Sequence, residues 1–312
     1  MVLGTGGTLA GTSDSTSDNV GYTAATVGIA QLLGAIDSLR DLPLHTEQVA
    51  QIDSKDMDEA VWLRLAQRCA HWLAQDDVQG IVVTHGTDTL EETAYLLQAL
   101  LAPTKPVVIT CAMRPSNAIS PDGPRNIVDA VAVASTPGAQ GVVAVCAGVI
   151  HCALDVRKVH TYRLDAFSSG DAGPVGHVEE GRVRQLREWP SATGPGIALP
   201  AEGVAWPRVE IVTSHGGACA GIVQALVADG VHGIVVAGTG NGSIHHALEG
   251  ALRSAQQQGV RVVRSTRCAE GVLVGGAANA FESAQGLSPV KARLALQLQL
   301  LATGTAPPAR AG

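Results

Sequence analysis

Residues 80–110 read GIVVTHGTDTLEETAYLLQALLAPTKPVVIT, and this stretch decides the fold. A β-branched apolar run at 80–84 precedes a helix-patterned stretch at 89–101, and a second such run follows at 106–110. This order predicts a β-α-β unit with two parallel strands. The first run is apolar at successive positions (Ile81, Val82, Val83), which is typical of a strand covered by helices on both faces.

The same alternation continues along the chain. The further predicted elements are helix 126–134, strand 141–146, strand 209–213, helix 221–229, strand 233–237, helix 244–258, strand 261–265 and helix 289–302. Between 190 and 207 the periodicity is lost and Pro, Gly, Ser and Ala dominate. We therefore predict two α/β domains, a larger N-terminal parallel-sheet domain (1–189) and a smaller C-terminal flavodoxin- or Rossmann-like domain (208–312), joined by a linker (190–207). Residues 303–312 are expected to form a frayed tail.

Composition excludes several classes of protein. The chain has 312 residues, of which 46% are hydrophobic and 16% are charged, so it buries substantial cores rather than staying disordered. Its net charge is −7 and it has no basic block, which argues against a nucleic-acid partner. No apolar run approaches the roughly 20 residues needed to cross a bilayer, so no membrane partner is expected. The first residues lack the features of a secretory signal, which predicts a cytoplasmic location, or a periplasmic one if a leader precedes them.

Cysteine and histidine give no metal signature. The six cysteines include no C-x-x-C pair, and their apolar contexts predict buried free thiols. The ten histidines include one adjacent pair, His245 and His246, whose side chains are expected to point apart on a helix. G-x-S-x-G, P-loop and H-E-x-x-H motifs are all missing. We therefore predict neither a metal site nor an organic cofactor.

Two polar, glycine-containing segments follow predicted strands, GTGGTLAG at 4–11 and THGTDT at 84–89. In open α/β sheets, ligands bind at the carboxyl ends of the strands, so these segments are the first candidates for a site. The first opens like a dinucleotide-binding fingerprint, but Leu9 holds its sixth position and a long polar loop (12–21) follows in place of a helix. A Rossmann dehydrogenase is therefore disfavoured.

Catalysis by a side-chain hydroxyl remains as a candidate chemistry. Thr8 lies in the glycine-rich loop, and Thr87 lies next to Asp88 at a strand end. A threonine hydroxyl is a weak nucleophile and needs a positioned base, such as a carboxylate or a lysine. Of the four lysines, Lys55 and Lys158 are the candidates, because the other two lie beside a proline and at the start of a terminal helix.

Taken together, these segments resemble the bacterial-type L-asparaginase family, amidohydrolases that convert asparagine and, to varying degree, glutamine to the acid and ammonia. The resemblance covers nearly the whole chain. Its carriers are TGGTLAG at 5–11, DSKDM at 53–57, HGTDTLEE at 85–92, AMRP at 112–115 with DGP at 122–124, and GNG at 240–242.

The resemblance implies a catalytic role for five residues. Thr8 matches the threonine that attacks the side-chain amide from a flexible loop closing over the substrate, and Tyr22 matches its activating tyrosine. Thr87, Asp88 and Lys158 match a second group, in which the lysine supports the threonine hydroxyl. The aspartate of that group also grips the α-ammonium of the substrate.

It also implies substrate contacts. Ser54 matches the residue that binds the α-carboxylate, and the backbone around Ala112 lies near the amide oxygen or the leaving ammonia. Lys55 stands where many members have glutamine, which replaces a neutral amide with a cation at the α-substituent end. We therefore expect stronger binding of the substrate carboxylate and poorer tolerance of longer side chains.

Family members form active sites between subunits, so the resemblance implies a homotetramer built from dimers. Asn241 and Ser243 are the expected cross-subunit contacts, and Ser243 stands where many relatives have asparagine. The glutamate that the family contributes across the interface has no clean match, because the segment 267–286 is shorter than usual. Glu270 and Glu282 are the nearby candidates.

The sequence therefore predicts an L-asparaginase that acts through threonine attack or threonine-assisted water attack. Two alternatives stay open. One is an amidase of this fold that acts on glutamine or another β-amide. The other is a non-catalytic amino-acid-binding protein, which would keep the cleft but lose a catalytic hydroxyl or lysine.

Overall fold

The computed structural model describes residues 1–192, 197–276 and 281–304. The predicted tail from residue 305 onward and part of the predicted linker (193–196) lie outside the described residues, as do residues 277–280. The chain divides into two compact units, Met1–Leu199 and Pro200–Gly312, which are described separately here. In the described parts, no helix combines the length and the apolar character that a membrane crossing requires.

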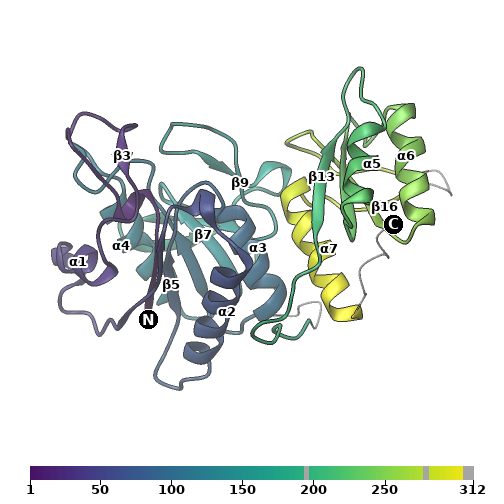
Figure 1. Ribbon diagram of the computed structural model, residues 1–312. Coiled ribbons are helices and arrows are strands. Elements are labelled where there is room, and N and C mark those ends of the chain that lie inside the picture. Colours follow the sequence, from purple (N-terminus) through teal and green to yellow (C-terminus); the bar gives the residue numbers. More distant parts are fainter. Residues whose placement is uncertain (193–196, 277–280, 305–312) are drawn as a thin grey trace. The chain divides into compact units, whose positions relative to one another are not determined.

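The N-terminal unit is built on an eight-stranded sheet (Figure 1). Its strands are β1 (Val2–Gly6), β4 (Thr46–Ile52), β5 (Ile81–Thr84), β6 (Val107–Thr110), β7 (Val142–Cys146), β8 (Val149–Cys152), β11 (Gly176–Glu179) and β12 (Arg182–Gln185). They lie in the order β12-β11-β8-β7-β6-β5-β1-β4. The run from β4 to β7 is parallel, as predicted, whereas β8, β11 and β12 extend it in antiparallel fashion.

The antiparallel extension begins at a two-residue turn. Ala147 and Gly148 connect β7 to β8, and both have positive φ, 50° and 76°. Such a turn matches the right-handed twist of its flanking strands and closes a tight hairpin, so no crossover helix is needed. The sequence prediction of a parallel sheet is thus confirmed for the five strands from β4 to β7 and incomplete for β8, β11 and β12.

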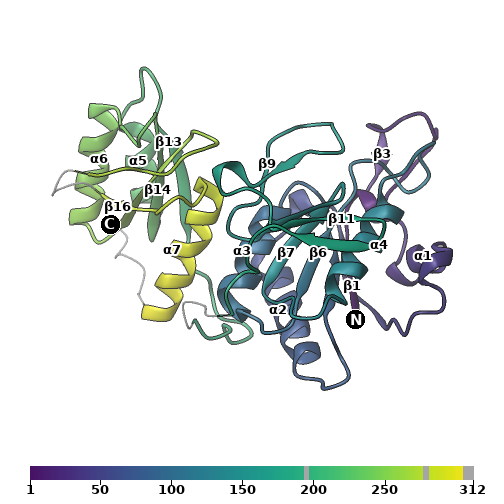
Figure 2. The same cartoon turned by 180° about the vertical axis from the view of Figure 1, so that it is seen from behind.

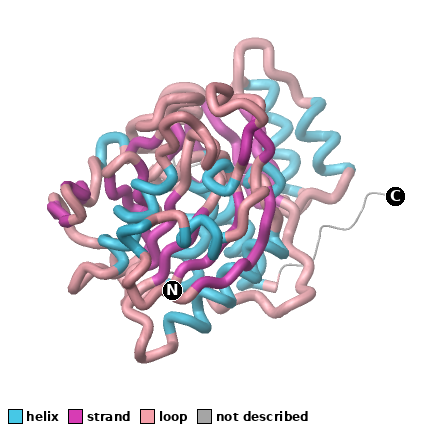
Figure 3. Tube along the Cα trace, turned by 90° about the vertical axis from the view of Figure 1, so that its left-hand side faces the viewer, coloured by secondary structure: helices cyan, strands magenta, loops and turns pink. Residues whose placement is uncertain are grey.

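Helices cover both faces of this sheet (Figures 1 and 2). They are α1 (Ile29–Gly34), α2 (Glu59–Leu73), α3 (Leu90–Leu101) and α4 (Gly123–Ala134). Ile81 and Val83 pack in one core with α2 and α3, whereas Val82 packs in the other with α1 and α4. Figure 3 shows the strands in magenta between helices in cyan. The successive apolar positions of β5 therefore serve two cores, as the sequence predicts.

Short elements occupy the connections. They are the single turns η1 (Thr8–Ala10), η2 (Asp37–Leu39), η3 (Ser54–Asp56) and η4 (Gly170–Ala172), and two small antiparallel ribbons, β2 (Thr12–Ser13) with β3 (Tyr22–Thr23) and β9 (Arg157–Lys158) with β10 (Phe167–Ser168). Within the polar segment expected to be a loop (12–21), only Thr12 and Ser13 form a strand, and the rest connects it to β3. The resulting hairpin projects beyond the sheet in Figure 1.

The C-terminal unit is a smaller parallel sheet with helices on both faces. Its described elements are β13 (Val209–Thr213), α5 (Gly221–Ala228), β14 (Gly233–Gly238), α6 (His246–Gln257), β15 (Arg261–Thr266), β16 (Glu282–Ser283) and α7 (Pro289–Thr303). α5 and α6 share one core, and α7 packs in the other. The predicted fold class, two α/β domains with the smaller one at the C-terminus, is confirmed.

The cysteines differ in part from expectation. Four of them are buried free thiols, as predicted: Cys69, Cys111, Cys146 and Cys152. Cys219 and Cys268 are exposed, and for them the prediction is wrong. Both lie in segments that connect elements of the C-terminal unit, where the apolar context in the sequence does not correspond to a packed face.

Candidate active site

The predicted site residues of the N-terminal unit lie at the carboxyl ends of four neighbouring strands. Thr8 follows β1, Ser54 follows β4, Thr87 and Asp88 follow β5, and Ala112 follows β6. These four strands are adjacent and parallel, so the turns that leave them meet at one edge of the sheet. The structure therefore brings together residues that are up to 104 positions apart in the sequence, from 8 to 112.

Two glycines let the turns after β1 and β5 touch. A Cβ added to Gly7, whose φ is 79°, would lie 2.4 Å from the Cα of Gly86. A Cβ on Gly86 would lie 2.4 Å from the Ser54 Oγ. Since neither position has room for a side chain, the backbones approach directly. Thr8 and Thr87, each the next residue in sequence, therefore project from turns in contact.

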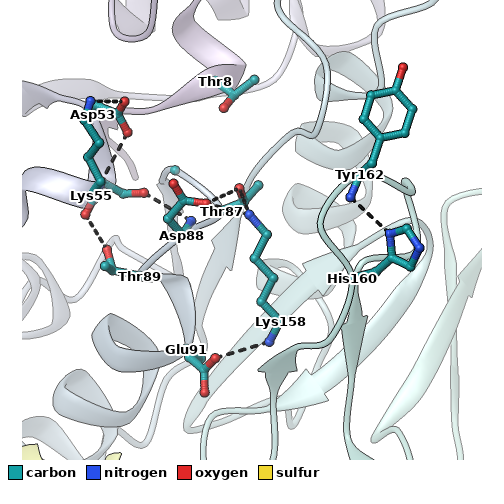
Figure 4. Close-up of polar contacts among 12 residues, drawn as sticks. Thr8, Asp53, Lys55, Thr87, Asp88, Thr89, Glu91, Lys158, His160 and Tyr162 are labelled. Atoms are coloured by element: carbon teal, nitrogen blue, oxygen red, sulfur yellow. Dashed lines mark hydrogen bonds and ion pairs between the residues drawn. The ribbon is translucent and has the colours of Figure 1, made fainter. Parts of the chain in front are cut away.

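Lys158 joins Thr87 and Asp88 (Figure 4). Its Nζ lies 2.7 Å from the Thr87 Oγ1 and 2.6 Å from the Asp88 Oδ1. The Thr87 hydroxyl donates to the same Asp88 oxygen at 3.4 Å. The Lys158 side chain is 19% exposed and that of Asp88 is 54% exposed. One ammonium thus bridges a buried hydroxyl and a carboxylate that is open to the surroundings.

Backbone contacts fix this triad in place. The backbone N–H of Lys158, which lies on β9, donates to the Glu91 carboxylate at the start of α3 (3.2 Å). The backbone N–H of Asp88 donates to the Ser54 Oγ (3.2 Å), and the Thr89 hydroxyl donates to the Ser54 carbonyl (2.8 Å). Glu91 is a positioning group that the sequence analysis missed. Its place in the first turn of a helix gave no sign of a contact with residue 158.

A second hydroxyl pair lies at the end of β1. Thr8 is buried in η1, and its Oγ1 lies 2.6 Å from the hydroxyl oxygen of Tyr22. Tyr22 reaches it from β3, which pairs with β2 so that Tyr22 stands opposite Ser13. The hairpin starts just after η1 and thus brings Tyr22 back to the turn that contains Thr8.

Lys55 points to neighbouring carboxylates. Its Nζ lies 2.7 Å from Asp53 and 3.6 Å from Asp56, and its side chain is 62% exposed. In Figure 4 the side chain ends beside Asp53. The hydrogen bond that the Lys55 ammonium donates to the Asp53 carboxylate raises the pKa of this ammonium. The positive charge expected at the α-substituent end is thus accompanied by two negative ones.

Asn241 and Ser243 belong to the C-terminal unit, and their role in a substrate site stays a prediction. The Asn241 side chain binds the backbone of Val274 through both its amide atoms, at 2.7 and 2.8 Å. Ser243 exchanges backbone hydrogen bonds with Thr239 at 2.8 Å. The candidate Glu282 is paired with Arg261 at 2.8 Å on the edge strand β16.

The structure shows no metal-binding cluster: no three His, Cys, Asp or Glu side chains of the described residues are grouped to hold an ion. The expectation that His245 and His246 point apart is wrong, since their rings stack with centroids 4.4 Å apart. His245 precedes α6 and its ring accepts the Ala247 N–H, so the side chain does not follow helix geometry.

Comparisons with known proteins identify the family of the chain. Residues 1–191 match the family model "Asparaginase, N-terminal", and residues 208–310 match "Glutaminase/Asparaginase C-terminal domain". The chain belongs to the asparaginase family. The resemblance drawn from the sequence motifs is confirmed.

Individual members of the asparaginase family are similar over almost the full length. L-asparaginase 2 of Bacillus subtilis (strain 168) is 40% identical, over 97% of this chain and 82% of its own. L-asparaginase 2 of Escherichia coli (strain K12) is 37% identical, over 97% and 88%. The crystal structure of a probable cytoplasmic L-asparaginase from Campylobacter jejuni superimposes with a TM-score of 0.90 at 40% identity, covering 97% of this chain and 94% of that one.

This member of the asparaginase family also has a buried histidine beside the site. His85 donates from Nδ1 to the Gly86 carbonyl (2.8 Å), and its Nε2 accepts the Thr93 hydroxyl (2.9 Å). The Trp62 indole N–H donates to the Thr93 oxygen (2.8 Å). Both ring nitrogens are thus satisfied by a neutral imidazole. Burial lowers the pKa of His85 to about 4.

We expect this histidine to make the fold acid-sensitive. Between pH 6.5 and about 4 the unfolded chain binds a proton at His85 and the folded chain does not, so the free energy of unfolding falls as the pH decreases. The full loss is about 3 kcal/mol for a pKa lowered from 6.5 to about 4. Urea unfolding followed by tryptophan fluorescence at pH 7, 6, 5 and 4.5 measures it. The His85→Gln variant should lose less stability over the same range, and an identical loss in both proteins would contradict the assignment.

Proposed function

We propose that this member of the asparaginase family hydrolyses L-asparagine to L-aspartate and ammonia through threonine hydroxyls. One observation carries the proposal: two activated hydroxyls, Thr8 with Tyr22 and Thr87 with Lys158 and Asp88, project from touching turns at one edge of the sheet. Amide hydrolysis needs a nucleophile, a proton path to the leaving nitrogen and charge stabilisation. These groups supply all three.

In the first route the Thr8 oxygen attacks the amide carbon. Its proton passes along the 2.6 Å contact to the Tyr22 oxygen, whose own proton reaches the leaving nitrogen. The C–N bond breaks, ammonia leaves and the acyl group stays on Thr8 as an ester. Water then adds to the ester carbon, which releases aspartate and restores the hydroxyl.

The group of Thr87, Lys158 and Asp88 either orients a water molecule or stabilises developing negative charge. The Lys158 ammonium, 2.7 Å from the Thr87 oxygen, supports negative charge that develops beside it. In the second route, a water molecule oriented by Thr87 attacks the amide directly. Asp88 is exposed enough to bind an α-ammonium, and the Ser54 hydroxyl beside it suits the α-carboxylate. Rapid-quench mass spectrometry separates the routes, because only the first leaves an acyl group on Thr8.

The first test is ammonia release by the purified chain with L-asparagine and L-glutamine side by side. Thr87→Val serves as the blank for contaminating activity. We expect turnover of asparagine that disappears in the blank. The glutamine reaction decides the second candidate, an amidase acting mainly on glutamine, which is consistent with the match of residues 208–310 to a glutaminase/asparaginase C-terminal domain. Binding of asparagine without turnover would overturn the proposal in favour of a non-catalytic binding protein.

We expect Lys55 to influence the choice between the two amides. The Lys55→Gln variant removes one positive charge and leaves the Asp53 and Asp56 carboxylates without that cation, which weakens binding of the substrate carboxylate. Because these groups are exposed, the effect is modest, about threefold in kcat/KM for asparagine, with a smaller asparagine-to-glutamine ratio. Steady-state kinetics with both substrates measure it. Lys105→Gln, at the opposite end of β6, is the control, and an unchanged ratio in Lys55→Gln would refute the specificity role.

The assembly we propose is a homotetramer in which Asn241 and Ser243 complete the site of a neighbouring copy. Two exposed apolar side chains support it: Val272 and Val274 are 63% and 70% exposed, in the segment that the Asn241 side chain binds. Light scattering after size exclusion gives the mass, and a monomer would reject the assembly.

The cytoplasm is the proposed location, in line with the name of the Campylobacter relative. Cell fractionation decides it.

A further inference from the structure

The hairpin that carries Tyr22 is fastened to the segment 113–122. The Ser116 N–H and hydroxyl both donate to the Gly11 carbonyl at 2.8 Å, just before the hairpin begins. Further along, the Ile119 N–H donates to the Thr16 carbonyl at 3.0 Å. The segment therefore follows one side of the hairpin over several residues.

Between these two points, Asn117 binds the hairpin with its side chain. The Ser13 N–H donates to the Asn117 Oδ1 at 2.9 Å, and the Asn117 Nδ2 donates to the Ser13 carbonyl at 2.7 Å. A carboxamide that satisfies both backbone groups of one residue replaces the contact of an additional strand. β2 has only two residues, so this is a large share of its hydrogen bonding.

The contact leads directly to the reacting hydroxyl. Ser13 is the residue that stands opposite Tyr22 in the β2–β3 pairing, and the Tyr22 hydroxyl lies 2.6 Å from the Thr8 Oγ1. Ser13 and Tyr22 are thus the two residues that link the Asn117 carboxamide to Thr8. A shift of Ser13 away from Asn117 moves the tyrosine opposite it.

The segment 113–122 is itself rigidly held at the sheet. The Asp122 carboxylate accepts the backbone N–H groups of Met113 and Arg114, both at 3.0 Å. The Asn126 side chain, in α4, donates to the Cys111 carbonyl at 2.9 Å and to Asp122 at 3.3 Å. Asn117 therefore ties a short, weakly paired hairpin to a braced loop that follows β6.

We propose that Asn117 is a positioning residue that holds the β2–β3 hairpin closed, so that the Tyr22 hydroxyl meets Thr8. This inference rests on the proposed function for its catalytic consequence but not for the closure itself. Without the carboxamide, the hairpin opens more often and Tyr22 is aligned in fewer molecules. Ser54 and Asp88 lie on other turns, so their binding of the substrate's α-groups is untouched.

Hydrogen exchange read by mass spectrometry tests the closure without any substrate. We expect Asn117→Ala to speed exchange about tenfold in peptides covering residues 9–24, because two hydrogen bonds are lost, and to leave α2 and α3 unchanged. Ile119→Ala is the matched control, since its side chain is 78% exposed and its contact to Thr16 uses only the backbone. Equal exchange in the wild-type and Asn117→Ala proteins would overturn the proposal.

Kinetics test the positioning role. We expect Asn117→Ala to lower kcat for asparagine about tenfold with KM within a factor of two, and Ile119→Ala to match the wild type. In a Tyr22→Phe background the same Asn117→Ala change should have almost no effect on kcat, because the aligned hydroxyl is already gone. Multiplicative effects of the two substitutions, or a change confined to KM, would overturn positioning through Tyr22.

The two proposals fail differently. If the wild-type chain releases no ammonia, the proposed function fails, while the exchange experiment still decides whether Asn117 closes the hairpin. If the wild-type chain is active and Asn117→Ala opens the hairpin with full kcat, the positioning inference fails alone.

Discussion

Replacing Lys158 with methionine is expected to lower kcat for asparagine hydrolysis by about a thousandfold. Methionine keeps most of the apolar stem but removes the ammonium that lies 2.7 Å from Thr87 and 2.6 Å from Asp88. The Thr87 hydroxyl then loses its charge support, and the Asp88 carboxylate loses its paired cation. Because the Asp88 backbone stays bound to Ser54, we expect KM to change less than kcat. Steady-state ammonia release measures both constants.

Lys105→Met is the matched control for this prediction. Lys105 precedes β6, and its ammonium donates to the Gln75 carbonyl at 2.7 Å, at the end of the sheet opposite the site. The same substitution there should leave kcat unchanged. A Lys158→Met protein that retains wild-type kcat, with a near-ultraviolet circular dichroism spectrum equal to that of the wild type, would remove the lysine from the mechanism.

The Thr8→Val substitution should lower kcat by about ten thousandfold, since it deletes the proposed nucleophile while keeping the shape of the side chain. It also leaves the Tyr22 hydroxyl without its 2.6 Å partner. Single-turnover experiments should then show no acyl intermediate. Thr12→Val, on the same hairpin, removes a hydroxyl whose partner is Thr26 and should keep nearly full activity. Residual activity of Thr8→Val within tenfold of the wild type would transfer the attack to the Thr87 group.

The central strands could be predicted from the sequence because each reads as an uninterrupted apolar run, and the helices α3 to α7 because each has a longer helix-like pattern. The helices α1 and α2 were not predicted. β5 and β6 lie between two cores, so they read as continuous apolar runs. β4 was missed because it is an edge strand of mixed polarity, in which only Val49 is fully buried. β11 and β12 are four residues each, too short for an alternating pattern to stand out from a loop.

The residues of the site could be predicted from the sequence, but the contacts between them could not. Motifs located Thr87 and Asp88 at a strand end, and the family resemblance supplied Lys158. That the lysine reaches both depends on the β9–β10 ribbon, which has two residues in each strand and no periodic signal. The anchoring of its backbone to Glu91 is likewise a tertiary contact, between residues 67 positions apart. The ion pairs of Lys55 with two acids follow from the local sequence Asp53-Ser54-Lys55-Asp56, but they were not among the predictions.

The contact between Gly7 and Gly86 has a consequence for how such a site is inherited. Any amino-acid replacement of a glycine introduces a Cβ, and at these two positions the Cβ collides with backbone or with Ser54. Neither position therefore has a conservative substitute. The lineage that carries this reaction must transmit two residues without a functional group as faithfully as the hydroxyls beside them. A search for distant members that scores reactive side chains alone would leave out these two glycines.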